Sequence, residues 1–244
     1  MKAADFINVL EEAFGIGFYA GVPDSLLSPF TGEIVNKYGV SDKHIVAANE
    51  GNATGLAAGY HLATGKIPCV YMQNSGEGNM LNPYASLLAP EVYRIPCVFV
   101  VGWRGEPGTK DEPQHVFQGE ITQSLMELLT IQTVIVRKDM TTDELKAAAE
   151  SLKQTLAEGK CVAFIVEKGA LTSDNPVKYV NPYTMKREEA LREIVKGIGE
   201  DIVVSTTGKA SRELFEIREQ NGQPHKYDFL TVGSMGHSSS VALS

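Results

Sequence analysis

Residues 44–66, HIVAANEGNATGLAAGYHLATGK, begin with a short apolar run, turn polar at Asn49 and Glu50, and continue as a segment rich in small residues. The run 44–48 has the length and apolar content of a buried strand, and 51–64 is long enough for a helix. A helix with so much glycine and alanine can approach another backbone closely. This stretch therefore predicts a strand–helix unit with Glu50 at its turn.

The same alternation extends in both directions along the chain. Further apolar runs predict strands at 17–22, 67–72, 96–102, 133–136 and 161–166. Helices are predicted at 1–15, 26–38, 118–130 and 142–157. Near-continuous apolar strands separated by helices are typical of a parallel sheet that is covered on both faces. We therefore predict an α/β domain over residues 1–170.

A second α/β pattern follows a polar, proline-containing segment at 171–185, which we interpret as a linker. A helix, a strand, a helix and a strand are predicted at 186–197, 202–205, 209–219 and 229–232, and a further helix opens near Gly236. Residues 186–244 are too few for a complete doubly wound domain. We therefore expect them to form the N-terminal part of an incomplete second α/β domain.

The composition limits the classes of partner. The chain has 244 residues and a formal net charge of −8, which argues against nucleic acid and anionic membranes as partners. Its N-terminus lacks the apolar centre of a signal peptide, and no apolar stretch has transmembrane length. Cys69, Cys97 and Cys161 are widely spaced in strand-like runs, so we expect buried thiols in a cytoplasmic protein.

Polar, glycine-rich segments follow the first four predicted strands. They read GVPDS (21–25), NEGN (49–52), QNSGEGN (73–79) and GWRGEPGTKDEPQH (102–115). The carboxyl ends of parallel strands meet at one edge of the sheet, and ligands bind at that edge. These four segments therefore predict one shared site.

The stretch AANEGNATGLAAGYHLATGK resembles the pyrimidine-binding domain of thiamine-diphosphate enzymes. Together with GVPDSLLSPF, YMQNSGEGN, GWRGEPGTKDEPQHVFQG, STTGKASRELFE and TVGSMGHSSSVAL, it resembles the phosphonopyruvate decarboxylases, and the related sulfopyruvate decarboxylases share much of this pattern. The resemblance implies thiamine diphosphate and Mg²⁺ as cofactors. The family's Gly-Asp-Gly signature is not found, so the metal ligands are expected beyond residue 244.

In this family a glutamate hydrogen-bonds the aminopyrimidine ring of the cofactor and so promotes loss of the thiazolium C2 proton. Glu50 matches that position. The alternative is a glutamate at a helix N-terminus, stabilised by the helix dipole. The resemblance also implies that Asp24 is an acid/base group and that Ser25 contacts substrate, whereas the alternative for Asp24 is a helix cap.

The loop 102–115 is too rich in glycine and proline for a helix and too long for a simple connection. Arginine's planar fork suits phosphonate or carboxylate oxygens, and lysine supplies a point charge. We therefore predict that Arg104 and Lys110 bind an anionic 2-oxoacid and that His115 transfers a proton. The alternative is a solvated charged lid, since three carboxylates of the same loop offset the cations.

Three further motifs contain residues that are predicted to contact the cofactor by resemblance. The alternatives are an ordinary loop for QNS and a core methionine in GSMGH. TTGK lacks the full Walker spacing of a phosphate-binding loop, but Gly208 and Lys209 open a predicted helix whose backbone N–H groups can hold an anion. The predicted contacts are Gln73, Asn74, Gly208, Lys209, Ser234, Met235, His237 and Ser238.

Residues and resemblance together predict decarboxylation of phosphonopyruvate to phosphonoacetaldehyde and CO2, in phosphonate biosynthesis, by a homo-oligomer with sites between its subunits. One alternative is the same chemistry on sulfopyruvate. A second is a non-catalytic pyrimidine-domain subunit, or a fragment, that needs a partner chain. A nicotinamide-dependent oxidoreductase is disfavoured because no G-x-G-x-x-G motif follows the first predicted strand.

Overall fold

The computed structural model describes residues 1–177 and 181–243. The chain divides into two compact units, Met1–Lys178 and Tyr179–Ser244. Three residues of the predicted linker, 178–180, and Ser244 of the predicted second domain lie outside the described residues.

The first unit is built on a six-stranded sheet in which all neighbouring strands are parallel. This confirms the predicted α/β architecture. The strands, in spatial order, are β2 (His44–Val46), β1 (Tyr19–Gly21), β3 (Cys69–Gln73), β4 (Val98–Gly102), β6 (Val162–Val166) and β5 (Gln132–Val136).

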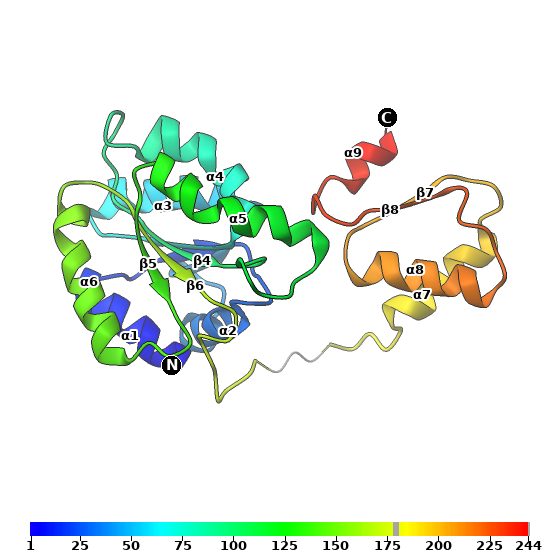
Figure 1. Cartoon of the computed structure of the whole chain (residues 1–244), viewed down its shortest axis with the longest axis horizontal. Helices are drawn as coiled ribbons and strands as arrows, with labels where there is room; N and C mark the ends of the chain where they lie inside the picture. The colour runs from blue at the N-terminus through cyan, green and yellow to red at the C-terminus, as the bar shows by residue number, and fades with distance from the viewer. Residues whose placement is uncertain (178–180, 244) are drawn as a thin grey trace. The chain divides into compact units, whose positions relative to one another are not determined.

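Helices cover both faces of this sheet (Figure 1). One face packs against α1 (Ala3–Phe14), α2 (Ser28–Tyr38) and α6 (Thr142–Ala157). The other packs against α3 (Glu50–Thr64), α4 (Glu77–Pro83) and α5 (Pro113–Leu128).

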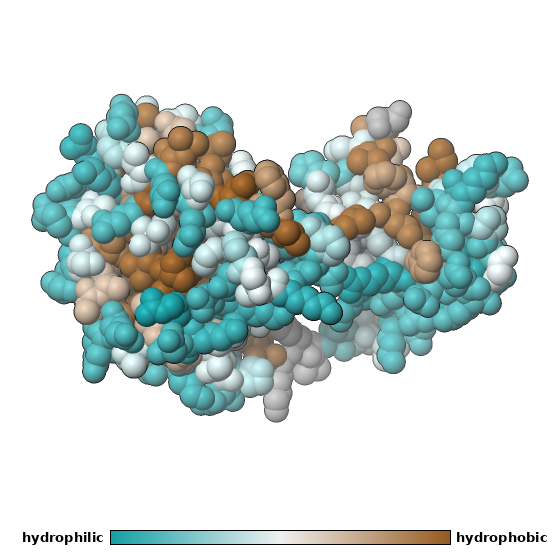
Figure 2. Space-filling model, viewed as in Figure 1, coloured by the Kyte–Doolittle hydropathy of each residue, from teal (hydrophilic) through white to brown (hydrophobic). Residues whose placement is uncertain are grey.

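Side chains of one strand alternate between the two cores, because successive residues of a strand point to opposite faces. In β3, Tyr71 belongs to the first core, whereas Val70 and Met72 belong to the second. Burial on both faces is the reason that the central strands β4 and β6 are apolar at every position. The outer surface seen in Figure 2 is mainly hydrophilic, with smaller apolar areas.

The order of the strands reverses between β1 and β3. From β1 the chain crosses first to β2 on one side, and β3 then pairs with β1 on the other side. Gly21 ends β1 here, and a Cβ at this residue would lie 2.2 Å from the carbonyl oxygen of Tyr71. Only glycine allows this approach, which brings the loops after β1 and β3 together at the switch point where open α/β sheets bind ligands.

Two expectations about helices were wrong. The helix predicted at 118–130 begins at Pro113, so the predicted loop ends earlier and His115 lies in the first turn of α5. Proline is tolerated there because the first helical residues need no N–H partner. The segment after β3, expected as a loop, is helical through η1 (Asn74–Gly76), α4 and η2 (Tyr84–Leu88).

The second unit contains α7 (Arg187–Gly197), β7 (Val203–Ser205), α8 (Lys209–Gln220), β8 (Asp228–Leu230) and α9 (Ser238–Leu243). The two strands pair in parallel. A small core of Val195, Leu214 and Ile217 holds the helices on the sheet. Before it, the start of the predicted linker is bonded to the first unit, since Thr172 N donates to Met1 O at 3.0 Å.

Glu77, the first residue of α4, is fully buried in the first unit. Among the described residues neither of its carboxyl oxygens has a hydrogen-bond partner. Burial raises its pKa from 4.5 to about 9, because an unpaired charge is costly away from water. The folded protein therefore keeps this carboxyl group protonated at neutral pH.

We predict that Glu77→Gln stabilises the protein increasingly as pH rises from 5 to 9. In the wild type, the unfolded chain loses the Glu77 proton above about pH 4.5, whereas the folded protein loses it only near pH 9. Between these values the free energy of unfolding of the wild type therefore falls by up to roughly 1.4 kcal/mol per pH unit. Denaturant titrations at pH 5, 7 and 9 measure the difference. Glu127→Gln, at an exposed position of α5, is the control. A stability difference that does not change with pH would contradict the assignment.

Candidate functional site

The site lies where the strands β1 to β4 end. Asp24 and Ser25 follow β1, Glu50 follows β2, Gln73 ends β3, and Arg104 lies two residues after β4. The switch point between β1 and β3 is at its centre. The fold therefore brings together the predicted residues of the four polar segments.

Glu50 is the first residue of α3, and Asn49 caps the helix by accepting a hydrogen bond from Asn52 N at 2.9 Å. The Glu50 side chain extends toward α4, where Asn79 Nδ2 donates to Glu50 Oε2 at 2.7 Å. Glu50 is 9% exposed. The helix dipole and a functional role are both compatible with this position, but the carboxylate is bonded to the neighbouring helix.

Gly76 makes room for that carboxyl group. A Cβ at residue 76 would lie 2.4 Å from Glu50 Cγ and 2.5 Å from Glu50 Oε1. Gly78, two residues along, has nothing within 4 Å of the corresponding position. Glu50 is therefore held between the Asn79 side-chain amide, which donates to it, and the backbone of Gly76, which approaches closely because residue 76 has no side chain.

Asp24 is buried and forms the turn before α2. Its Oδ2 accepts hydrogen bonds from Leu26 N at 3.0 Å and Leu27 N at 3.2 Å. Burial raises its pKa above 3.8 even though these backbone bonds and the Arg104 guanidinium lower it. Asp24 therefore stabilises the turn ahead of α2 and does not cap the helix, whose N-cap residue, Leu27, has no side-chain cap, so the capping alternative is wrong. The raised pKa means that Asp24 holds a proton more readily than an ordinary aspartate.

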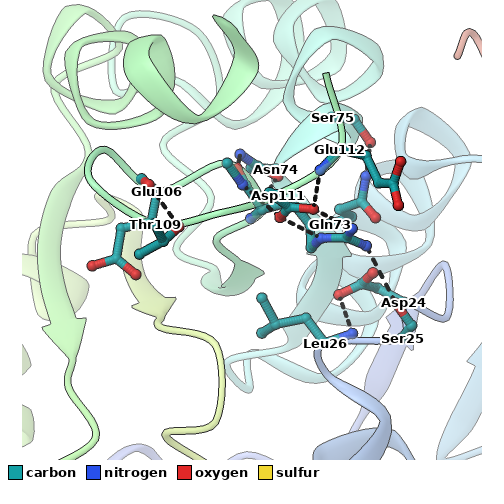
Figure 3. A network of polar contacts seen from close by, with 12 residues as sticks. Asp24, Ser25, Leu26, Gln73, Asn74, Ser75, Glu106, Thr109, Asp111 and Glu112 are labelled. Atoms are coloured by element: carbon teal, nitrogen blue, oxygen red, sulfur yellow. Dashed lines mark hydrogen bonds and ion pairs between the residues drawn. The ribbon is translucent and has the colours of Figure 1, made fainter. Parts of the chain in front are cut away.

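Arg104 is paired with Asp111 of the same loop. Its Nε donates to Asp111 Oδ2 at 2.8 Å and its Nη2 to Oδ1 at 2.5 Å, while Nη1 reaches Ser25 Oγ at 3.4 Å. Figure 3 shows Asp111 on one side of this network and Asp24 with Ser25 on the other. The ion pair holds the pKa of Asp111 well below its usual range.

The other two predicted residues of this loop differ in position. His115 is half-buried, and burial together with the Arg104 charge lowers its pKa below 6.5. It is therefore uncharged at neutral pH and can accept a proton. Lys110 is exposed and, within 1–177, has no bond to the Arg104 network.

Asn74 and Gln73 have partners within the protein. Asn74 Nδ2 donates to Arg104 O at 2.8 Å and to Thr122 Oγ1 at 2.9 Å, and Asn74 Oδ1 accepts from Arg104 N at 3.2 Å. The Asn74 amide, predicted as a cofactor contact, thus holds the Arg104 backbone. Gln73 Nε2 donates to Ser75 Oγ at 2.7 Å.

The predicted cofactor residues of the second unit share one edge of its sheet. Gly208 has φ +84°, lies in the short loop after β7 and precedes Lys209, the first residue of α8. The segment that contains Ser234, Met235, His237 and Ser238 follows β8. Thr207 Oγ1 donates to Val232 O and links the two loops. Met235 is 74% exposed, so in the described structure it is not a core methionine.

The contacts of Asn79 and Gly76 with Glu50, and of Asp111 with Arg104, were not predicted from the sequence. Asn79 and Gly76 belong to QNSGEGN, so the motif marked their neighbourhood but not their contact with Glu50. Among the described residues there is no group of three or more His, Cys, Asp or Glu that could hold a metal ion. Within the same residues, no helix has the length and apolar content needed to cross a membrane.

Comparison with known proteins gives a family match. Residues 1–126 match the family described as "Thiamine pyrophosphate enzyme, N-terminal TPP binding domain". The chain is 35% identical over 260 residues to phosphonopyruvate decarboxylase from Streptomyces viridochromogenes, covering 99% of this chain and 62% of that protein. It is 40% identical over 88 residues to sulfopyruvate decarboxylase subunit alpha from Methanothermobacter thermautotrophicus, covering 36% of this chain and 51% of that one. This chain thus spans less than two thirds of the length of either relative.

Among solved structures, the chain is similar to the thiamine diphosphate-dependent 4-hydroxybenzoylformate decarboxylase of Rhodococcus jostii RHA1. The TM-score is 0.50 at 19% identity, and the match covers 87% of this chain and 41% of that one. At this identity the similarity concerns the fold alone, and it agrees with the parallel sheet described above.

We predict that Arg104→Met raises the pKa of Asp24 further. The substitution removes the positive charge that now lowers it and leaves burial, the main cause of the upward shift, in place. A pH titration of the Asp24 carboxyl carbon by NMR measures the change. Lys110→Met, which removes an exposed charge of the same loop, is the control and leaves the Asp24 pKa unchanged. An Asp24 pKa that falls or stays constant in Arg104→Met would contradict the coupling.

Proposed function

This chain belongs to the thiamine pyrophosphate enzyme family, and from that membership we propose that it binds thiamine diphosphate and takes part in decarboxylation of phosphonopyruvate to phosphonoacetaldehyde and CO2. The observation that carries the proposal is the buried Glu50 carboxyl group at the switch-point edge, held between Asn79 and Gly76. We propose a role in phosphonate biosynthesis on the same basis.

The residues present suit the aminopyrimidine end of the cofactor. Glu50 Oε2 has one donor, Asn79, and its other oxygen lies against the Gly76 backbone. A carboxyl group with a fixed position and little exposure can hold a ring nitrogen and share a proton with it. Gly55 of α3, where nothing lies within 4 Å of the position of a Cβ, leaves room for a flat ring to approach the backbone.

When bound, thiamine diphosphate supplies a thiazolium carbon that accepts the electrons released as a 2-oxoacid loses CO2. The chain's own groups would then orient the substrate and manage protons. Asp24, whose pKa is raised by burial, would hold a proton at its carboxyl group. His115, uncharged at neutral pH, would accept one at its ring nitrogen.

The proposed substrate is an anionic 2-oxoacid. Arg104 and Ser25 face one another across the site, and Arg104 is the cation within reach of Ser25 in the described residues. A guanidinium group and a hydroxyl group are suited to phosphonate or sulfonate oxygens. Two relatives that align along almost the whole chain are phosphonopyruvate decarboxylases, which favours phosphonate. Lys110, exposed on the same loop, would add an electrostatic contribution.

Contacts with the diphosphate end are proposed for the second unit. Backbone N–H groups at Gly208 and Lys209 open α8, and an anion is stabilised at such a helix start. Ser234, Met235, His237 and Ser238 are proposed as further contacts. The Mg²⁺ ligands are proposed to lie outside these 244 residues, in keeping with the share of its relatives that the chain spans.

Assembly and location are part of the proposal. We infer a cytoplasmic homo-oligomer in which the pyrimidine-binding unit of one chain meets the diphosphate-binding part of another. The second candidate is a sulfopyruvate decarboxylase made of separate subunits. The match to a protein named subunit alpha favours this candidate, because that relative is one chain of a multi-chain enzyme.

The test of function is a substrate comparison with the protein as encoded by its gene. Thiamine diphosphate and Mg²⁺ are added, and aldehyde formation from phosphonopyruvate, sulfopyruvate and pyruvate is measured. We expect kcat/KM for phosphonopyruvate to exceed that for pyruvate by at least about tenfold, since one charge-assisted hydrogen bond is worth roughly 1.5–3 kcal/mol. A preference for sulfopyruvate would contradict the proposed substrate and leave the proposed cofactor supported. No turnover by folded, cofactor-bound protein would contradict the proposal.

A further inference from the structure

Asp111 is the centre of the loop that follows β4. Its carboxylate accepts hydrogen bonds from Arg104 Nε and Nη2, from Gly105 N at 2.9 Å and from Glu112 N at 2.8 Å. The Asp111 side chain is 6% exposed and that of Arg104 is 19% exposed. Charge-assisted, two-point pairing of this kind fixes geometry as well as adding energy.

Arg104 is fixed at its backbone as well as at its side chain. The Asn74 amide accepts from Arg104 N and donates to Arg104 O, while Asp111 binds the Nε–Nη2 edge of the guanidinium group. Of the five guanidinium N–H donors, two face Asp111 and one faces Ser25, which leaves two for a ligand. The orientation of these remaining donors is set before any ligand arrives.

We propose that Asp111 is a positioning residue that holds Arg104 against Ser25 as a preformed receptor for the tetrahedral anionic end of the substrate. The inference rests on the proposed function and deepens it by naming the group that is recognised. The Ser25 hydroxyl accepts from Arg104 Nη1 and keeps its own hydrogen for the ligand. A tetrahedral anion offers three oxygens to these donors, whereas a carboxylate offers two.

Two effects of Asp111 on an anionic ligand oppose one another. Its negative charge repels the anion and offsets the charge of Arg104. Its two-point pairing removes rotamer freedom from the Arg104 side chain, so that the ligand does not have to order it. The four donors around Asp111 disperse its negative charge, and we therefore expect positioning to dominate.

The test is the binding of methylphosphonate to the cofactor-loaded full protein, measured by calorimetry for the wild type and for variants. Asp111→Asn keeps the shape of the side chain and removes its charge, and we expect it to weaken methylphosphonate binding at least fivefold. Arg104→Met should weaken binding more, and the double variant should bind no more weakly than Arg104→Met, because Asp111 acts through Arg104. Glu106→Gln, on the same loop, is the control and should bind as the wild type does.

A carboxylate that only competes for Arg104 would give the opposite result, tighter methylphosphonate binding in Asp111→Asn, and this would overturn the proposal. Additive losses in the double variant would also overturn it. Affinity for acetate should change less than twofold, whereas general loop damage would weaken both anions. If Asp111→Asn does not fold, Arg104→Lys tests the same point, since lysine keeps the charge but cannot form the two-point pair; unchanged binding there would overturn the proposal.

The two proposals fail separately. If the wild type binds methylphosphonate through Asp111 and Arg104 but decarboxylates no 2-oxoacid, the receptor proposal is supported and the proposed function is contradicted. If the protein decarboxylates phosphonopyruvate but Asp111→Asn binds methylphosphonate as the wild type does, the proposed function is supported and the receptor proposal is contradicted.

Discussion

The contact between the Glu50 carboxyl group and the Gly76 backbone is the constraint on which the rest of the site depends. Residue 76 has no side chain, so the start of α4 lies against the start of α3 and Asn79 reaches Glu50 Oε2 at 2.7 Å. The helix α3 follows β2 and α4 comes after β3, and these two strands flank β1 in the sheet, where Gly21 permits close contact with Tyr71. The position of one carboxyl group thus follows from backbone approaches at two glycines.

Charge around this edge is organised locally, against a net charge of −8 for the whole chain. Arg104 is held by Asp111, one of its remaining donors reaches Ser25, and its charge lowers the pKa of the buried Asp24. The lowered pKa of His115 and the raised pKa of Asp24 follow from burial in the same place. An anion at Arg104 would therefore lie near a carboxyl group that binds a proton more readily than usual and an imidazole that binds one less readily.

The strands and most helices could be predicted because their apolar runs reflect burial on both sheet faces. The helical segment 74–88 could not, because its glycines, asparagines and Pro83 disfavour a helix locally and tertiary packing decides. The position of Glu50 after a strand could be predicted from the sequence, but its hydrogen-bond partner Asn79 could not. Likewise, composition shows three carboxylates in the 102–115 loop, but only the folded loop selects Asp111 as the partner of Arg104.

The most direct test of the central claim is the rate of hydrogen–deuterium exchange at C2 of thiamine diphosphate, measured at saturating cofactor in Gly76→Ala and Gly78→Ala. A methyl group at residue 76 collides with the flexible end of Glu50 and displaces the carboxyl group, whereas one at residue 78 meets nothing within 4 Å. We expect Gly76→Ala to slow exchange by at least about tenfold, toward the rate of Glu50→Gln, and Gly78→Ala to match the wild type. Exchange in Gly76→Ala as fast as in the wild type, in a folded and cofactor-bound protein, would contradict the account.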